Sequence, residues 1–198
     1  MIKNILKETI ISLGTSIFMS IIYLLLFMGC SMLYSAANAF FAFLGDTGKN
    51  ILLFVFMFAL FGVIMYVNNH VSYDYAYKKT FDGKFNEKEQ LISLGIALVL
   101  QLVFLFLTLG DSPFLSTVAF GSAYYSLPFC GIAAMIFGTE YIGTFVGAIV
   151  GTVIFYVVRY FSMLESYRYV VSRSEHLLLK KKKDAIEGFF SGEKDFES

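Results

Sequence analysis

The sequence predicts an all-α polytopic membrane protein with four transmembrane helices, a helical segment between the third and fourth of them, and a cytoplasmic extension of the last helix. Of the 198 residues, 58% are hydrophobic and only 15% are charged, whereas about a quarter of the residues in a soluble domain are charged. Several long apolar stretches contain no charge at all. The basic residues gather in the segments that these stretches place on one side of a membrane.

Four apolar stretches are long enough, at about 1.5 Å per residue, to cross about 30 Å of hydrocarbon. A short polar turn separates the first two, and Asn86 followed three residues later by Glu89 predicts the N-terminus of the third helix. The predicted spans cover residues 10–34, 51–67, 91–109 and 141–158.

The segment 113–138 is predicted to be helical but not to cross the membrane. Ser112 and Pro113 have the pattern of a helix N-terminus, and Pro128 divides the segment into pieces shorter than the ~20 residues that a crossing needs. The segment is therefore a re-entrant or outer-surface pair of short helices, with a single kinked span as the alternative.

The positions of the basic residues favour the first interpretation. With four spans, fourteen of the fifteen lysines and arginines lie on the cytoplasmic side, and only Lys49 lies outside. A fifth span would place the eight basic residues of the C-terminal part opposite the others and remove this bias. We expect a bacterial inner-membrane protein with both termini in the cytoplasm and residues 1–158 as its membrane domain.

The connection 68–90 allows two interpretations. Tyr73, Tyr75 and Tyr77 alternate with other residues before the turn dipeptide Asp82-Gly83, which is compatible with a small β-hairpin. The same tyrosines are also typical of a loop anchored at the lipid headgroups.

The last span carries a stripe of small residues, Gly143, Gly147 and Gly151, spaced by four. Such a stripe lets another helix backbone approach closely. The pattern predicts helix packing, either between copies of the chain or inside one subunit.

A heptad of apolar residues continues past the end of the last span, through Val157, Leu164, Val171 and Leu178. It predicts a cytoplasmic helix over 159–183 that packs against a partner or another copy; the alternative is an amphipathic helix lying on the membrane. The run Lys180, Lys181, Lys182 and Lys183 favours contact with anionic headgroups. Residues 184–198 are predicted to form a mobile acidic tail.

The predicted spans contain no Asp, Glu, Lys, Arg or His, which disfavours proton pumps and intramembrane proteases. Gln101 is a possible pore residue or, more simply, an interhelical hydrogen-bonding group. His70 and Asp74 are too few for catalysis or for a metal site. Cys30 and Cys130 could form a disulfide on the outer side. Unpaired thiols are the simpler interpretation, because cysteine behaves as a small apolar residue in membrane helices. We therefore expect no enzyme, metal or cofactor.

Three acids, Asp46, Asp111 and Glu140, fall on the predicted outer side. Repeated in a symmetric oligomer they would form rings of the kind found at cation-selective mouths. They are also ordinary solvated ends of helices, with Glu140 favoured at a helix N-terminus.

The expected function is that of a non-enzymatic, homo-oligomeric inner-membrane sensor or anchor, which couples to a soluble cytoplasmic partner through its last helix and tail. One alternative is a channel-like oligomer that conducts ions or small solutes. Another is a substrate-binding membrane subunit of a transporter for an uncharged molecule. Membrane lipids are expected partners, and the zero net charge gives no support to direct nucleic-acid binding.

Overall fold

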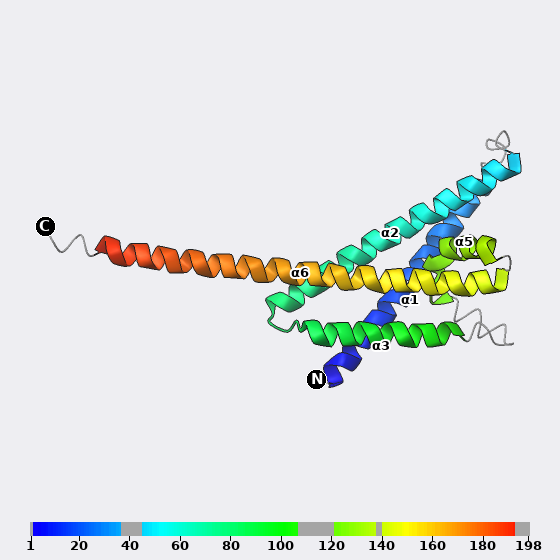
Figure 1. Cartoon of the computed structure of the whole chain (residues 1–198). Helices are drawn as coiled ribbons and strands as arrows, with labels where there is room; N and C mark the ends of the chain where they lie inside the picture. The colour runs from blue at the N-terminus through cyan, green and yellow to red at the C-terminus, as the bar shows by residue number, and fades with distance from the viewer. Residues whose placement is uncertain (1, 37–44, 107–120, 138–139, 193–198) are drawn as a thin grey trace.

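The computed structural model describes residues 2–36, 45–106, 121–137 and 140–192, and these ranges are helical with short turns and no strand. Figure 1 shows the helices in chain order. They are α1 (Ile2–Ala36), α2 (Gly45–Phe81), α3 (Glu87–Phe106), the 3-10 helix η3 (Tyr124–Ser126), α5 (Leu127–Phe137) and α6 (Glu140–Gly192).

Four of these helices, α1, α2, α3 and α6, are long and apolar enough to cross a membrane. The chain is thus an all-helical membrane protein with four candidate spans, as its sequence predicts. Each helix contains the corresponding predicted stretch, except that residues 107–109 of the third lie outside the described part of the chain.

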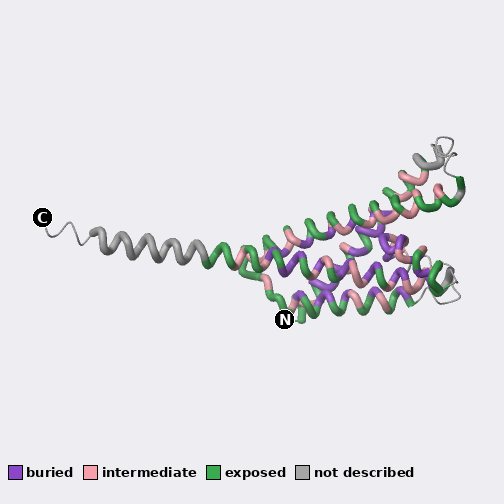
Figure 2. Tube along the Cα trace, turned by 45° about the horizontal axis from the view of Figure 1, so that its top comes forward, coloured by how far each residue is buried: buried purple, intermediate pink, exposed green. Residues whose placement is uncertain are grey.

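The long helices form a bundle in which α1 packs on α3, α2 packs on α6, and the short α5 lies along α6. Buried residues gather along the faces where these helices meet, and exposed residues face outward (Figure 2). Many of the exposed residues are large and hydrophobic. Such outward apolar faces suit a lipid environment. One end of α6 continues well beyond the other helices (Figure 1).

Helix α2 runs without a break as far as Phe81, so both the hairpin and the anchored-loop interpretations are wrong for residues 68–81. Asn68, Ser72 and Ala76 are completely buried, and their spacing of four places them on one face of a helix. This face packs into the bundle. The burial of its side chains favours a helix over the strand that the alternating tyrosines suggested. The helix ends at Phe81, and Gly83 in the turn that follows has a positive φ of 67°, which suits a glycine after a helix C-terminus.

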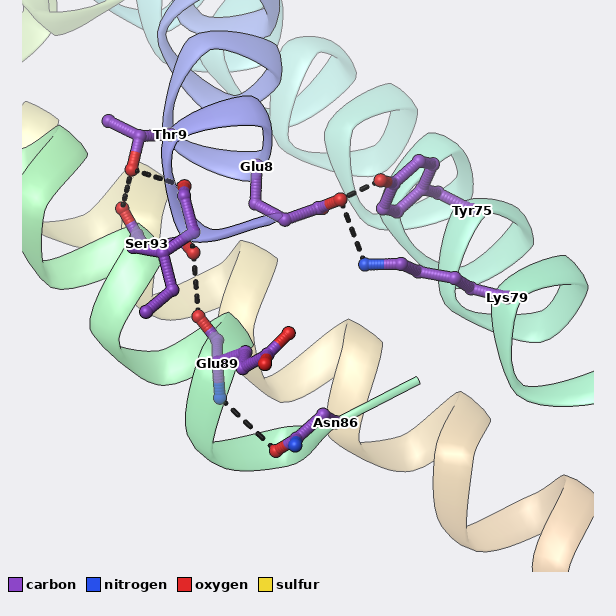
Figure 3. Close-up of polar contacts among 8 residues, drawn as sticks. Glu8, Thr9, Tyr75, Lys79, Asn86, Glu89 and Ser93 are labelled. Carbon is purple, nitrogen blue, oxygen red and sulfur yellow. Dashed lines mark hydrogen bonds and ion pairs between the residues drawn. The ribbon is translucent and has the colours of Figure 1, made fainter. Parts of the chain in front are cut away.

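Helix α3 begins where its capping residue predicts. The Asn86 side chain accepts hydrogen bonds from the backbone N–H groups of Lys88 (3.1 Å) and Glu89 (3.3 Å). These bonds satisfy two donors that a helix start otherwise leaves free, and they confirm the N-cap (Figure 3).

The described part of the segment 113–138 is η3 followed by α5, and Pro128 lies in the first turn of α5. A proline there costs no hydrogen bond, because the first N–H groups of a helix have no partner within it. The proline therefore starts this short helix instead of kinking a longer one. Ser112 and Pro113 lie outside the described residues.

The three glycines of the last span pack against η3 and α5 of the same chain. A Cβ on Gly143 would meet Ala134, one on Gly147 would meet the backbone of Cys130, and one on Gly151 would meet Ser126. The partners descend in number as the glycines ascend, so α5 and α6 run antiparallel in close contact. The stripe is used inside one subunit, and self-association of the chain requires another surface.

Candidate functional site

The first cluster of buried polar groups, the Gln101 cluster, lies between α1, α3, α6 and the turn before α5. The side chain of Gln101 is only 3% exposed. Its Oε1 accepts hydrogen bonds from Ser16 and Tyr156, each at 2.9 Å. Its Nε2 donates to the carbonyl of Ser122 (2.9 Å) and to the hydroxyl of Tyr125 (3.2 Å). Both ends of the amide are thus occupied within the chain, which favours an interhelical contact over a pore-lining role.

Serines on α1 tie this helix to the turn that precedes α5. Ser12, Ser16 and Ser20 are buried and spaced by four, so they form one polar stripe along α1. Ser20 donates a 2.8 Å hydrogen bond to the same Ser122 carbonyl that Gln101 contacts. A backbone turn inside a membrane bundle needs such partners, because lipid offers none.

The second cluster, the ionic cluster, surrounds Glu8 near the start of α1. Glu8 is only 4% exposed. Its carboxylate forms an ion pair with Lys79 at 2.9 Å and accepts a 2.6 Å hydrogen bond from the hydroxyl of Tyr75. Figure 3 shows both α2 side chains pointing at this carboxylate. Hydrogen bonds of Thr9 and Ser93 join α1 to α3 beside it.

Arg159 of α6 belongs to the ionic cluster but has few partners. It is 1% exposed, and its Nη1 donates a 3.3 Å hydrogen bond to Ser72. Within the described part of the chain, its Nε has no hydrogen bond and its guanidinium forms no ion pair. The charge of Glu8 acts on it at longer range. A buried charge with so little compensation marks a position of functional interest in a membrane bundle.

Helix α6 connects the two clusters. Tyr156 contributes to the Gln101 cluster, and Arg159, one turn further, contributes to the ionic cluster. Ser162 then donates to Asn69, and Ser166 donates to the carbonyl of Tyr73 at 2.9 Å. Successive turns of α6 are therefore bonded to α2, and Tyr156 also joins α6 to α3.

The heptad residues predicted to couple to a partner do not share one free face. Val157 is 45% exposed and Leu164 is 9% exposed. Leu164 lies beside Phe85 and Gln90 of the same chain. Val171 is half-buried, and the side chains of Leu178 and Lys180–Lys183 lie outside the described part, although the α6 backbone continues through them to Gly192.

No described contact brings together the three acids that were predicted to form rings at a cation-selective mouth. Asp46 lies in the first turn of α2 and Glu140 begins α6, but their side chains are outside the described part, as is all of Asp111.

The other polar pairs carry no metal site or disulfide. His70 and Asp74 are 3.8 Å apart and exposed. No group of three His, Cys, Asp or Glu side chains that could hold a metal occurs among the described residues. Cys30 and Cys130 are both free thiols, as the simpler expectation had it.

Sequence reasoning missed the burial of Glu8 and Arg159, because both lie just outside the apolar stretches 10–34 and 141–158 that it identified. One signal could have found Glu8. It lies four residues before Ser12 and so continues the buried α1 stripe of Ser12, Ser16 and Ser20 on the polar face of an otherwise apolar helix.

No protein family, curated protein or solved structure matches the chain.

Proposed function

We propose that this chain is a non-enzymatic, oligomeric inner-membrane sensor or anchor that couples to a soluble cytoplasmic partner through its last helix. The observation that carries the proposal is the continuity of α6, a single helix of 53 residues. At about 1.5 Å per residue it is about 80 Å long, more than twice the hydrocarbon thickness of a bilayer. A helix of this length is suited to join a membrane bundle to a binding surface far outside it.

The proposed orientation places both termini in the cytoplasm, because fourteen of the fifteen basic residues then lie there. The turn before α5 and α5 itself form a re-entrant segment in this proposal. Ser126, the last residue of η3, is level with Gly151, which lies about 16 Å along α6 from its first residue. That depth is close to the middle of a bilayer. The lysines 180–183 attract anionic headgroups or a partner.

Labelling of single cysteines tests the orientation. In a Cys30→Ser, Cys130→Ala background, we expect Lys3→Cys and Ser198→Cys to react with a membrane-impermeant maleimide only after the membrane is opened. Thr47→Cys, exposed at the start of α2, should react in intact cells. Reaction of Ser198→Cys from outside would establish a fifth crossing and overturn the proposed architecture.

Coupling follows from the bonds that α6 makes in the bundle. Tyr156 and Arg159 belong to the two buried clusters, so any rearrangement of either cluster acts directly on α6. Tyr167 stacks on Phe85 with ring centroids 5.0 Å apart, which is the last described ring contact of α6 with the connection between α2 and α3. Past this contact α6 still lies beside Tyr77 and Phe81 of α2, and in this proposal the rest of its surface contacts the partner.

The partner surface is tested at Val171, in the part of α6 that lies past this contact. We expect Val171→Asp to leave membrane levels unchanged and to reduce partner contact about tenfold, because a charge replaces an apolar contact residue. A photoreactive residue at position 174 measures contact with the partner as the yield of a discrete cross-linked product in cells. We expect Val171→Asp to reduce this yield.

Ser172→Asp is the matched control, since Ser172 is exposed, is adjacent, and lies off the heptad. Leu164→Asp is expected to lower protein levels instead, because Leu164 packs inside the bundle. A cross-link that persists equally in Val171→Asp and Ser172→Asp would contradict the proposed surface.

A further inference from the structure

More buried donors surround the Glu8 carboxylate than form bonds with it. The carboxylate pairs with Lys79 at 2.9 Å and accepts a 2.6 Å hydrogen bond from Tyr75 (Figure 3). Gln90 and Arg159 also lie within electrostatic reach of this carboxylate. Both are at most 2% exposed, and the Nε2 of Gln90 and the Nε of Arg159 find no acceptor among the residues that the structure describes. One carboxylate is thus shared unequally among several buried donors.

Helix α2 places the guanidinium of Arg159 less than one turn from this carboxylate along its axis. Arg159 donates to Ser72, and Glu8 accepts from Tyr75. Ser72 and Tyr75 are three residues apart, so they lie on one face of α2 and about 4.5 Å apart along the helix. A rearrangement of the Arg159 and Glu8 side chains, with at most a small shift of α6, therefore joins the two groups.

The exposure of the two cations favours an exchange of partners. The side chain of Lys79 is 19% exposed, whereas Arg159 is 1% exposed. If Arg159 takes the carboxylate, two buried charges compensate each other and the released Lys79 ammonium turns to water. A buried charge without a partner is costly, and a lysine at the edge of a bundle is not. The loss of one ion pair is thus offset by the formation of the other.

We propose that the Glu8 carboxylate exchanges between Lys79 of α2 and Arg159 of α6. The structure shows the first arrangement, in which the carboxylate ties the start of α1 to α2. In the second arrangement it ties α1 to α6 instead. The exchange is a two-state device inside the bundle that changes the helix to which α1 is attached. It does not depend on the proposed coupling to a cytoplasmic partner.

Arginine-specific ¹⁵N labelling tests whether Arg159 takes the carboxylate, because the chain contains only three arginines. The Nε–H signal of Arg159 is assigned by its loss in Arg159→Met. In Lys79→Gln we expect this signal to move to higher proton chemical shift, because the carboxylate then accepts the idle Nε–H. Adding Glu8→Gln should cancel the movement.

Lys84→Gln is the matched control for this measurement. Lys84 also pairs with a carboxylate, that of Asp82 at 3.6 Å, but the pair is exposed. Its loss should leave the Arg159 signal in place. An Arg159 signal that is the same in Lys79→Gln and Lys84→Gln would overturn the proposal.

Acylation of Lys79 tests the exchange with Glu8 and Lys79 both unchanged. The second arrangement frees the Lys79 amine for an amine-reactive ester, and mass spectrometry of the digested protein measures its rate of reaction in detergent. Arg159→Met removes the competing partner, so we expect Lys79 to react several-fold more slowly. Lys78 and Lys84, which are exposed, are internal controls whose rates should not change. A Lys79 rate unaffected by Arg159→Met would show that the exchange does not occur.

Discussion

Leucine at position 147 is expected to destabilise the folded chain by about 3 kcal/mol or more. Gly147 lies against the backbone of Cys130 and Phe129 in α5, and a backbone cannot move aside as the end of a flexible side chain can. The substitution should therefore separate α5 from α6. Thermal unfolding in detergent measures the loss, and the reaction rate of the buried Cys130 thiol in a Cys30→Ser background reports the separation directly.

Gly62→Leu is the control for this experiment. Gly62 is also a helical glycine, but a Cβ there would meet no atom within 4 Å. Its replacement should change stability by less than about 0.5 kcal/mol or increase it slightly, because leucine favours helix over glycine. An unchanged melting temperature and thiol rate in Gly147→Leu would show that α5 does not rest on the glycine stripe.

Removal of the Glu8 carboxylate is the second large effect. Glu8→Ala should cost about 3 kcal/mol, because it unpairs the partly exposed Lys79, leaves the Tyr75 hydroxyl without its acceptor and removes the carboxylate charge that acts on Arg159 at longer range. Arg159→Met alone should be close to neutral, since an apolar side chain of similar length replaces a poorly partnered charge. Combined with Glu8→Ala, it should recover the part of the loss that comes from the uncompensated Arg159 charge, but not the part that comes from Lys79 and Tyr75.

Equilibrium unfolding of the two single variants and the double variant measures this coupling. Asp82→Ala removes the carboxylate from an exposed ion pair with Lys84 and should cost less than about 1 kcal/mol. If Glu8→Ala were no more harmful than Asp82→Ala, the ionic cluster would have no energetic importance. Cross-linking to the partner in the Arg159→Met variant, which is expected to be stable, then tests whether partner contact depends on Arg159.

The number of candidate spans could be predicted from sequence, because a bilayer imposes one length and one polarity on every crossing helix. The start of α3 was equally accessible, since Asn86 caps the helix through purely local bonds. These features depend on residues close together in the chain.

The clusters could not be predicted in the same way, because their members are distant in the sequence. The partners Glu8 and Lys79 meet only when α1 packs beside α2. The continuation of α2 through Tyr75 was ambiguous for a related reason. Alternating tyrosines are compatible with several structures, and the tertiary contacts of buried Ser72 and Ala76 favour the helix. Likewise, the glycine stripe indicated a close helix neighbour without saying that it is α5.

The length of α6 has a mechanical consequence. From Arg159 to Gly192 the helix extends about 50 Å. If it pivots as a stiff rod at the ionic cluster, a tilt of about 5° moves its far end by about 4 Å, while Arg159 itself barely shifts. A displacement of this size approaches one helical turn. A rearrangement smaller than an ångström among buried side chains would thus become a change in position that a bound protein could register.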